Sequence, residues 1–260
     1  MILPVRLTFC CAAFAASLAV AATTTTPARA EGDDAEKILK AMSDYLAAQK
    51  NLSVAFDSSI EVVTPQMEKI QFDNSGSLHL VRPDKIHATR TGGYSDVEMV
   101  FDGKTFTVFG KNIDGYIKLP AAGTVDQLID MLRDRGRALP GADLLLSDVY
   151  STLSKEIIDA KHIGEGVVGG IECEHLAFRQ QDTDWQLWVR AGSDPIPCKM
   201  VVTSKAVGQA PQYTLTIRDW KTDVPVDDAA FTFKPPAGAK EVSADMFAEM
   251  DELPPSGPAK

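Results

Sequence analysis

Apolar and polar side chains alternate with a period of two residues along most of this 260-residue chain. Such alternation is typical of strands that bury one face. It is clearest near the C-terminus, where Tyr213, Leu215 and Ile217 alternate with polar neighbours. The dipeptide Asp102-Gly103, between two alternating runs, is a strong hairpin signal. The pattern predicts roughly ten antiparallel strands between residues 54 and 220.

The period changes to 3.6 residues in three places, which indicates amphipathic helices. Asp33 or Asp34 caps the first helix, which runs to about Lys50; Thr124 is the expected N-cap of the second, and a third follows Pro140. Because such helices bury their apolar stripes on a sheet, we expect an α+β fold with a curved, open sheet. A closed up-and-down barrel with a ligand inside is the alternative. The apolar stripes are Ile38, Leu39, Met42, Tyr45 and Leu46; Val125, Leu128, Ile129 and Leu132; and Leu144, Leu145, Val149 and Leu153.

Residues 1–30 have the three parts of a secretory signal peptide. Arg6 supplies the positive start, residues 7–22 are almost wholly apolar, and Ala28-Arg29-Ala30 fits the small-x-small cleavage pattern. A transmembrane anchor is the alternative, although the apolar stretch is shorter than the roughly 20 residues that a span needs. The leader predicts an exported, periplasmic protein whose mature chain has no transmembrane segment.

The mature chain is expected to form one domain over residues 31–242 and a disordered, acidic, Pro-rich tail over residues 243–260. The full chain carries 36 acidic and 26 basic side chains, a net charge of −10, and loss of the leader makes it −12. Nucleic acid and anionic membrane surfaces both require clustered Lys and Arg, so this balance excludes them as the main partner. We expect a monomer.

Two cysteines, Cys173 and Cys198, remain after cleavage of the leader. An oxidising compartment allows them to form a disulfide, and two free buried thiols are the alternative. Pairing needs Cα atoms within about 7 Å. The first and third strands of a simple meander lie about 10 Å apart, so the third strand must start close to the first.

Several short segments together resemble a known family, and the match covers about residues 34–242. The chain resembles exported bacterial proteins of unknown function within the LolA/LolB-like lipoprotein-carrier superfamily. This resemblance implies a strongly curved, incomplete antiparallel barrel whose helices cover its concave, apolar face, and a hydrophobic cavity that takes acyl chains. The segments that carry the resemblance are Arg82–Ile86, Phe101–Lys104, Cys173–Arg179, Asp184–Trp188, Pro195–Lys199 and Phe231–Gly238.

Signatures of catalysis and of cofactor binding are weak. Residues 164–169 match G-x-G-x-x-G, but a β segment follows where a dinucleotide site needs a helix, so a glycine-rich hairpin or bulge is expected. None of the four histidines, His79, His87, His162 and His175, has a metal-type spacing. We therefore expect no cofactor, no metal and no enzyme; a hydrolase assembled only in three dimensions is a third alternative.

The leading hypothesis is a periplasmic protein that holds a hydrophobic ligand, an acyl chain, lipid or lipoprotein, without catalysis. The alternative is that the candidate lining residues only fill a dry hydrophobic core. A competing class is an interaction module that binds an envelope protein, because a related fold serves in envelope-stress regulation. Arg133, Arg135 and Arg137 complement the dipole of the middle helix or form a basic spot for a lipid phosphate at the cavity mouth. The candidate lining residues are Phe56, Leu80, Met99, Phe101, Phe106, Val108, Leu128, Leu132 and Leu145.

Overall fold

The computed structural model describes residues 28–137 and 140–243. Most of the expected signal peptide and nearly all of the expected tail lie outside the described residues. Twelve strands form a single sheet. The strands are β1 (Asn51–Val63), β2 (Lys69–Val81), β3 (Lys85–Gly92), β4 (Asp96–Phe101), β5 (Thr105–Gly110), β6 (Gly115–Pro120), β7 (Asp159–Val168), β8 (Ile171–Arg179), β9 (Thr183–Arg190), β10 (Pro197–Ser204), β11 (Gln212–Thr222) and β12 (Lys240–Glu241). The helices are α1 (Ala28–Ala48), α2 (Val125–Asp134) and α3 (Val149–Leu153), with short 3-10 helices η1 (Ala142–Leu145) and η2 (Asp228–Phe231).

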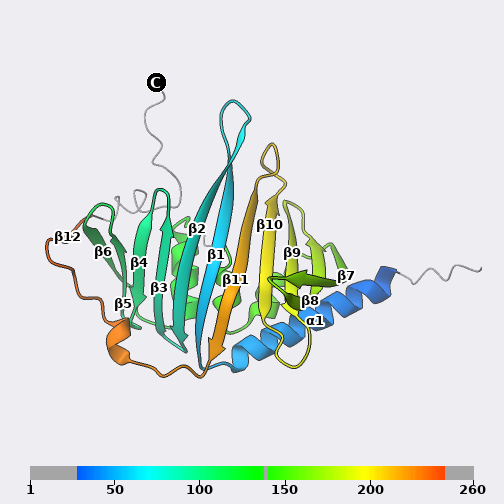
Figure 1. Cartoon of the computed structure of the whole chain (residues 1–260), viewed down its shortest axis with the longest axis horizontal. Coiled ribbons are helices and arrows are strands. Elements are labelled where there is room, and N and C mark those ends of the chain that lie inside the picture. Colours follow the sequence, from blue (N-terminus) through cyan, green and yellow to red (C-terminus); the bar gives the residue numbers. More distant parts are fainter. Residues whose placement is uncertain (1–27, 138–139, 244–260) are drawn as a thin grey trace, which may run out of the picture.

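The sheet consists of two meanders that meet at its centre. The strand order is β12-β6-β5-β4-β3-β2-β1-β11-β10-β9-β8-β7, so β1 pairs with both β2 and β11. All ladders are antiparallel except the short β12–β6 pair. The outermost strands, β12 and β7, are not neighbours, and the sheet stays open and curved (Figure 1). The expected open, curved sheet is confirmed, and the closed barrel is wrong.

Helices pack on one face of the sheet and divide the core into two clusters. α1 runs along the lower edge and crosses the β7–β9 half, while α2 and α3 lie behind the sheet in the view of Figure 1. One cluster joins α2 to β1–β6. The other joins α1 and α3 to β7–β11. Ile217 and Trp220 of the central strand β11 pack against both clusters. None of the helices in the described part of the chain is both long and apolar enough to span a bilayer.

Three expected elements differ from the observed ones. The first helix begins at Ala28, so Asp33 and Asp34 lie inside it and do not cap it. The single helix expected after Pro140 is interrupted: Leu146 is extended (φ −63°, ψ 156°), and Asp148 starts a new helix by accepting a hydrogen bond from the Ser151 amide at 3.0 Å. The apolar period continued across this break because both short helices face the same core. The segment Phe231–Gly238, which resembles the closing strand of lipoprotein carriers, leaves η2 as irregular chain before β12.

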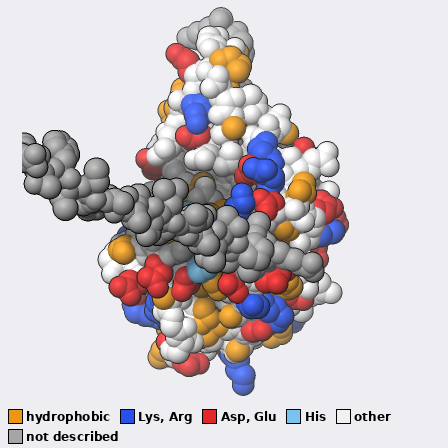
Figure 2. All heavy atoms as spheres, turned by 90° about the vertical axis from the view of Figure 1, so that its right-hand side faces the viewer, with side chains coloured by type: hydrophobic (Ala, Val, Ile, Leu, Met, Phe, Trp, Pro, Cys, Tyr) orange, Lys and Arg blue, Asp and Glu red, His pale blue; other side chains and the backbone are white. Residues whose placement is uncertain are grey.

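The glycine-rich segment forms a hairpin, as expected. β7 and β8 are joined at Gly169 and Gly170, whose positive φ angles of 58° and 85° suit a tight two-residue turn. The β7–β8 register shifts between His162 and Gly164, so Ile163 is an extra residue in the edge strand. Such a bulge protects an edge from pairing with another chain. Figure 2, which faces this end of the sheet, shows acidic, basic and apolar side chains interspersed over the described surface.

Candidate functional site: an apolar cavity under the sheet

A cavity of about 450 Å³ lies between the β1–β5 and β11 part of the sheet and the segment from α2 to η1. This volume falls within the roughly 300–1,000 Å³ typical of ligand pockets. Most of its lining is apolar, as in such pockets. The sheet contributes Val54, Phe56, Ser58, Ile60, Leu78, Ile86, Ala88, Arg90, Val97, Met99, Phe106, Val108, Pro197, Tyr213, Leu215, Ile217 and Trp220. The cover contributes Leu128, Ile129, Leu132, Gly136, Arg137, Pro140, Gly141, Ala142, Leu144 and Leu145.

The sequence positions α2 over the sheet by its cap and its apolar stripe. Thr124 is the N-cap: its hydroxyl accepts from the Gln127 amide at 3.3 Å, and its own amide donates to Gln127 Oε1 at 2.9 Å. This reciprocal capping box satisfies amides that the first turn leaves unpaired. From this start, Leu128, Ile129 and Leu132 fall on one buried face and form the helical wall of the cavity.

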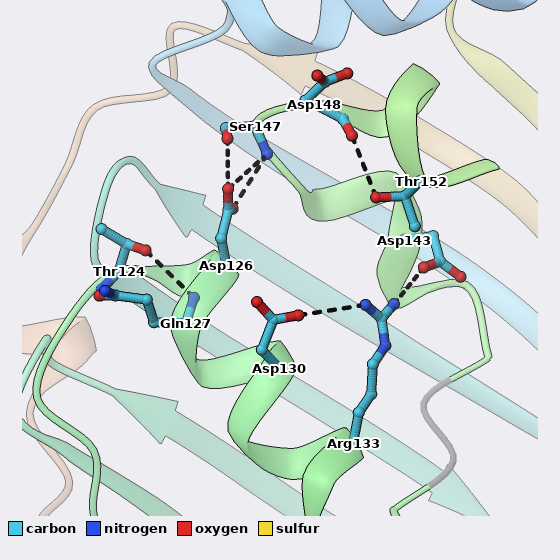
Figure 3. A network of polar contacts seen from close by, with 9 residues as sticks. All are labelled: Thr124, Asp126, Gln127, Asp130, Arg133, Asp143, Ser147, Asp148 and Thr152. Atoms are coloured by element: carbon cyan, nitrogen blue, oxygen red, sulfur yellow. Dashed lines mark hydrogen bonds and ion pairs between the residues drawn. The ribbon is translucent and has the colours of Figure 1, made fainter. Parts of the chain in front are cut away.

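Polar contacts on the outer side fix the cover segments to one another (Figure 3). Asp126, in the first turn of α2, accepts hydrogen bonds from the amide and the hydroxyl of Ser147. Arg133, in the last turn, forms ion pairs with Asp130 at 3.6 Å and with Asp143 of η1. Each of these surface contacts contributes little free energy by itself, but together they fix the positions of α2, η1 and α3 relative to one another. Arg133 therefore links α2 to η1 within the cover.

A half-buried arginine links the cover to the sheet. Arg82, at the end of β2, donates from Nη2 to the Leu146 carbonyl at 3.1 Å. Burial lowers the pKa of this guanidinium from its ordinary value, and the charge of Asp126 opposes that change. The hydrogen bond reaches the cover at Leu146, the extended residue that ends η1.

The structure brings together seven of the nine residues expected to line a cavity. Leu80 and Phe101 are instead fully buried in the core of the same half, away from the cavity surface. Both side chains lie on the inward face of the sheet, as the alternation predicts, but they are buried in the core and do not reach the cavity surface. The seven residues at the cavity are Phe56, Met99, Phe106, Val108, Leu128, Leu132 and Leu145.

A close approach at Gly76 shapes the sheet wall. A Cβ at this position would lie 2.4 Å from the Thr89 carbonyl oxygen and 2.5 Å from the Phe56 ring. The missing side chain lets the Phe56 ring extend across β2 toward β3. An isolated glycine inside an alternating strand is the signal for such an approach, and it is the one clue to this feature in the sequence.

Sequence reasoning named one polar residue of the lining, Arg137, as part of an alternative basic spot at the cavity mouth, and it missed Arg90, Ser58 and Trp220. Arg90, on β3, and Arg137, just after α2, are half-buried and line the cavity. Ser58 and Trp220 also line it, and their side-chain Oγ and Nε1 atoms are buried without a hydrogen-bond partner. The inward parity of β1 and β3 could have identified Ser58 and Arg90, because each shares its strand face with apolar lining residues. Trp220 has the opposite parity to Leu215 and Ile217, and it faces inward because the β1–β11 register shifts beyond Ile217.

The two cysteines lie on strands that flank β9. Cys173 in β8 and Cys198 in β10 are buried, free thiols in this structure. The β9–β10 register shifts between Pro197 and Lys199, so Cys198 stands at a bulge. Burial, and next a hydrogen bond with Cys173, raise the pKa of the Cys198 thiol above its ordinary value. The two thiols are thus near each other across β9. Pairing also needs Cα atoms within about 7 Å, and the disulfide stays a prediction.

Each histidine of the second meander has a side chain within hydrogen-bond distance. His162 Nε2 lies 2.7 Å from Glu174 Oε2, and His175 Nε2 lies 2.9 Å from Gln186 Oε1. The His175 ring also stacks on Trp188 with centroids 4.1 Å apart. Within residues 28–137 and 140–243, no cluster of three or more His, Cys, Asp or Glu side chains could hold a metal ion. These contacts support strand pairing on the sheet surface.

Comparisons with solved structures show similar folds at low identity. An uncharacterized conserved protein from Thermus thermophilus is 11% identical with a TM-score of 0.48, and the match covers 80% of this chain and 98% of that one. A chain of the Pseudomonas aeruginosa MucA/MucB complex is 14% identical with a TM-score of 0.41, covering 76% of this chain and 60% of that one. A LolA superfamily protein from Nitrosomonas europaea is 12% identical with a TM-score of 0.39, covering 76% and 97%.

These likenesses concern the fold alone, and this chain spans less than two thirds of the matched chain of the MucA/MucB complex. No curated protein matches the sequence. Residues 35–244, nearly all of the described chain, match the family described as "Predicted periplasmic protein (DUF2092)". The chain therefore belongs to this family and is a periplasmic protein.

Proposed function

We propose that this protein is a non-enzymatic periplasmic binding protein that holds an apolar chain in the cavity between its sheet and the α2–η1 cover. The observation that carries the proposal is the 450 Å³ cavity with a mainly apolar lining. An apolar chain gains about 0.8 kcal/mol for each methylene removed from water, so such a cavity needs no catalytic group to retain its ligand. The protein would act, as a monomer, by shielding that chain in the aqueous periplasm.

Native mass spectrometry of protein purified gently from the periplasm tests the proposal, combined with organic extraction of bound molecules. A reproducible mass increment that extraction identifies as a lipid or another acylated molecule is the expected result. A protein of unmodified mass that also fails to bind fluorescent fatty-acid probes would refute the proposal. In that case, a pull-down that recovers one stoichiometric envelope protein would favour an interaction module with a filled core.

A pair of methionine variants tests whether binding uses this cavity. Met99 lines the cavity from β4, whereas Met131 packs against the same core from α2 without lining it. Met99→Trp should place a large ring in the cavity and weaken binding of a fluorescent fatty acid at least tenfold. Met131→Trp is the matched control and should bind as the parent protein does. Equal affinities for both variants would show that the ligand binds elsewhere.

A further inference from the structure

The charged residues of the cavity lining have one sign. The chain as a whole is acidic, with 36 acidic and 26 basic side chains. Among the described residues that line the cavity there is no Asp or Glu, and the charged ones are Arg90 and Arg137. Arginine in a mainly apolar pocket is suited to carboxylate and phosphate groups, which its planar donors can bind in pairs.

The two arginines belong to opposite walls. Arg90 projects from β3, directly between Gly76 of β2 and Val97 of β4 in the sheet register. Arg137 follows α2, and its amide donates to the Leu132 carbonyl at 3.0 Å. One guanidinium therefore comes from the sheet and the other from the helical cover. A ligand that fills the cavity passes between these walls and can meet both.

A buried hydroxyl on the sheet wall adds a second, independent observation. Ser58 is only 4% exposed, lines the cavity, and has no hydrogen-bond partner for its Oγ atom. It occupies the next inward-facing position beyond Phe56, whose row in the sheet contains Gly76 and Arg90. A buried polar group without a partner destabilises a protein, so it points to an acceptor supplied by a ligand.

We infer that the ligand is an anionic amphiphile. Its apolar chain lies along the cavity, and its carboxylate or phosphate head is held by Arg90 and Arg137, with the Ser58 hydroxyl as a further donor. This inference rests on the proposed function and names its ligand class. The hydrogen-bond donors select for an anionic head group, and the apolar lining buries the hydrocarbon chain.

Amphiphiles with one chain length and different heads test the inference on the unaltered protein. Palmitate, hexadecyl phosphate, hexadecanol and hexadecyltrimethylammonium are compared by displacement of a fluorescent fatty acid. A charge-assisted hydrogen bond is roughly twice as strong as a neutral one, so we expect one or both anions to bind at least about tenfold tighter than the alcohol, and the cation to bind worst. The stronger of the two anions identifies the head as carboxylate or phosphate.

Arginine variants locate the head. Arg90→Gln and Arg137→Gln should each reduce the preference for the best anion about tenfold and leave hexadecanol binding unchanged. Arg135→Gln is the matched control, because Arg135 is exposed at the end of α2 and does not line the cavity. Thermal melts check that each variant is folded.

The outcomes separate the two proposals. Equal binding of all four amphiphiles would overturn the anionic head and leave the proposed function intact. Binding of none would overturn the proposed function itself. An anion preference that survives both cavity variants would overturn the roles of Arg90 and Arg137, even if one variant fails to fold, because the other and the head-group series remain informative.

Discussion

Reduction of the protein should lower its thermal stability by an amount set by the Cys173–Cys198 loop. The two thiols are near each other across β9, and Cys198 stands at a bulge of β10. A bond between them closes a loop of about 25 residues, which the chain-entropy relation converts to about 3.5 kcal/mol at 25 °C. For a domain of this size, 1 kcal/mol shifts Tm by about 2–4 °C, so reduction should lower Tm by about 7–14 °C.

Thermal melts of periplasmic protein, with and without a phosphine reductant, measure this shift. The Cys173→Ser/Cys198→Ser double variant is the control, and its Tm should not respond to the reductant. Peptide maps under reducing and non-reducing conditions identify the linked peptides directly. A Tm that reduction leaves unchanged, with both thiols found free in the map, would refute the disulfide and leave two buried thiols.

The pKa of Cys198 adds a pH signature to the reduced protein. Burial raises this pKa in the folded state, so the folded protein binds the thiol proton more tightly than the unfolded chain does. The associated stability is intact below the ordinary thiol pKa and falls as pH rises above it. The reduced protein should therefore lose stability faster above roughly pH 8.5 than the double serine variant, and react slowly with alkylating agents.

Three further outcomes concern the fold around the cavity. Gly76→Ala should cost about 1–3 kcal/mol in urea unfolding, because the new Cβ meets the Thr89 carbonyl and the Phe56 ring. Thr124→Ala should cost about 1 kcal/mol by loss of the α2 cap, and unchanged stability would contradict the capping box. A hydrogen bond with Lys69 lowers the pKa of Glu61 in the folded protein. The stabilisation that this bond provides is therefore complete above the ordinary Glu pKa and is lost as pH falls through the lowered pKa of Glu61. Lys69→Gln should raise the pKa of Glu61 in an NMR titration.

The local patterns predicted the faces of the strands well. Leu215 is buried and Ile217 faces both core clusters, as the alternation in β11 requires. The Thr124 cap and the buried stripe of α2 also follow the sequence directly. These features depend on neighbours within one helical turn or one strand. Such short-range determinants are visible in a single sequence because each residue's surroundings are set by its own element.

Long-range features were less accessible. The pairing of β1 with β11 joins residues more than 150 positions apart, for example Phe56 with Ile217. Periodicity places each of them on a face but does not select the partner strand. Arg90 was missed for a related reason. A charged residue at an inward-facing position of a strand looks like a break in the apolar pattern until the residues around it in the fold are known. The break at Leu146 was not predicted, because an apolar stripe shows which way side chains face and does not show whether the helical backbone is continuous.

The two halves of the sheet are covered differently, and this leads to a last prediction. The 21-residue α1 fills the β7–β9 half with fully buried Leu39, Met42 and Leu46, whereas the 10-residue α2 covers the half that contains the cavity. Apart from Pro197, which precedes Cys198 and lines the cavity, the cysteine pair adjoins none of the described lining residues in sequence, and sites with few shared partners act nearly additively. Reduction of the Cys173–Cys198 pair should therefore lower Tm and leave the affinity for a fluorescent fatty acid unchanged within about twofold. A tenfold loss of affinity on reduction, measured well below the lowered Tm, would show instead that the central strand β11, which packs against both cores, couples the two halves.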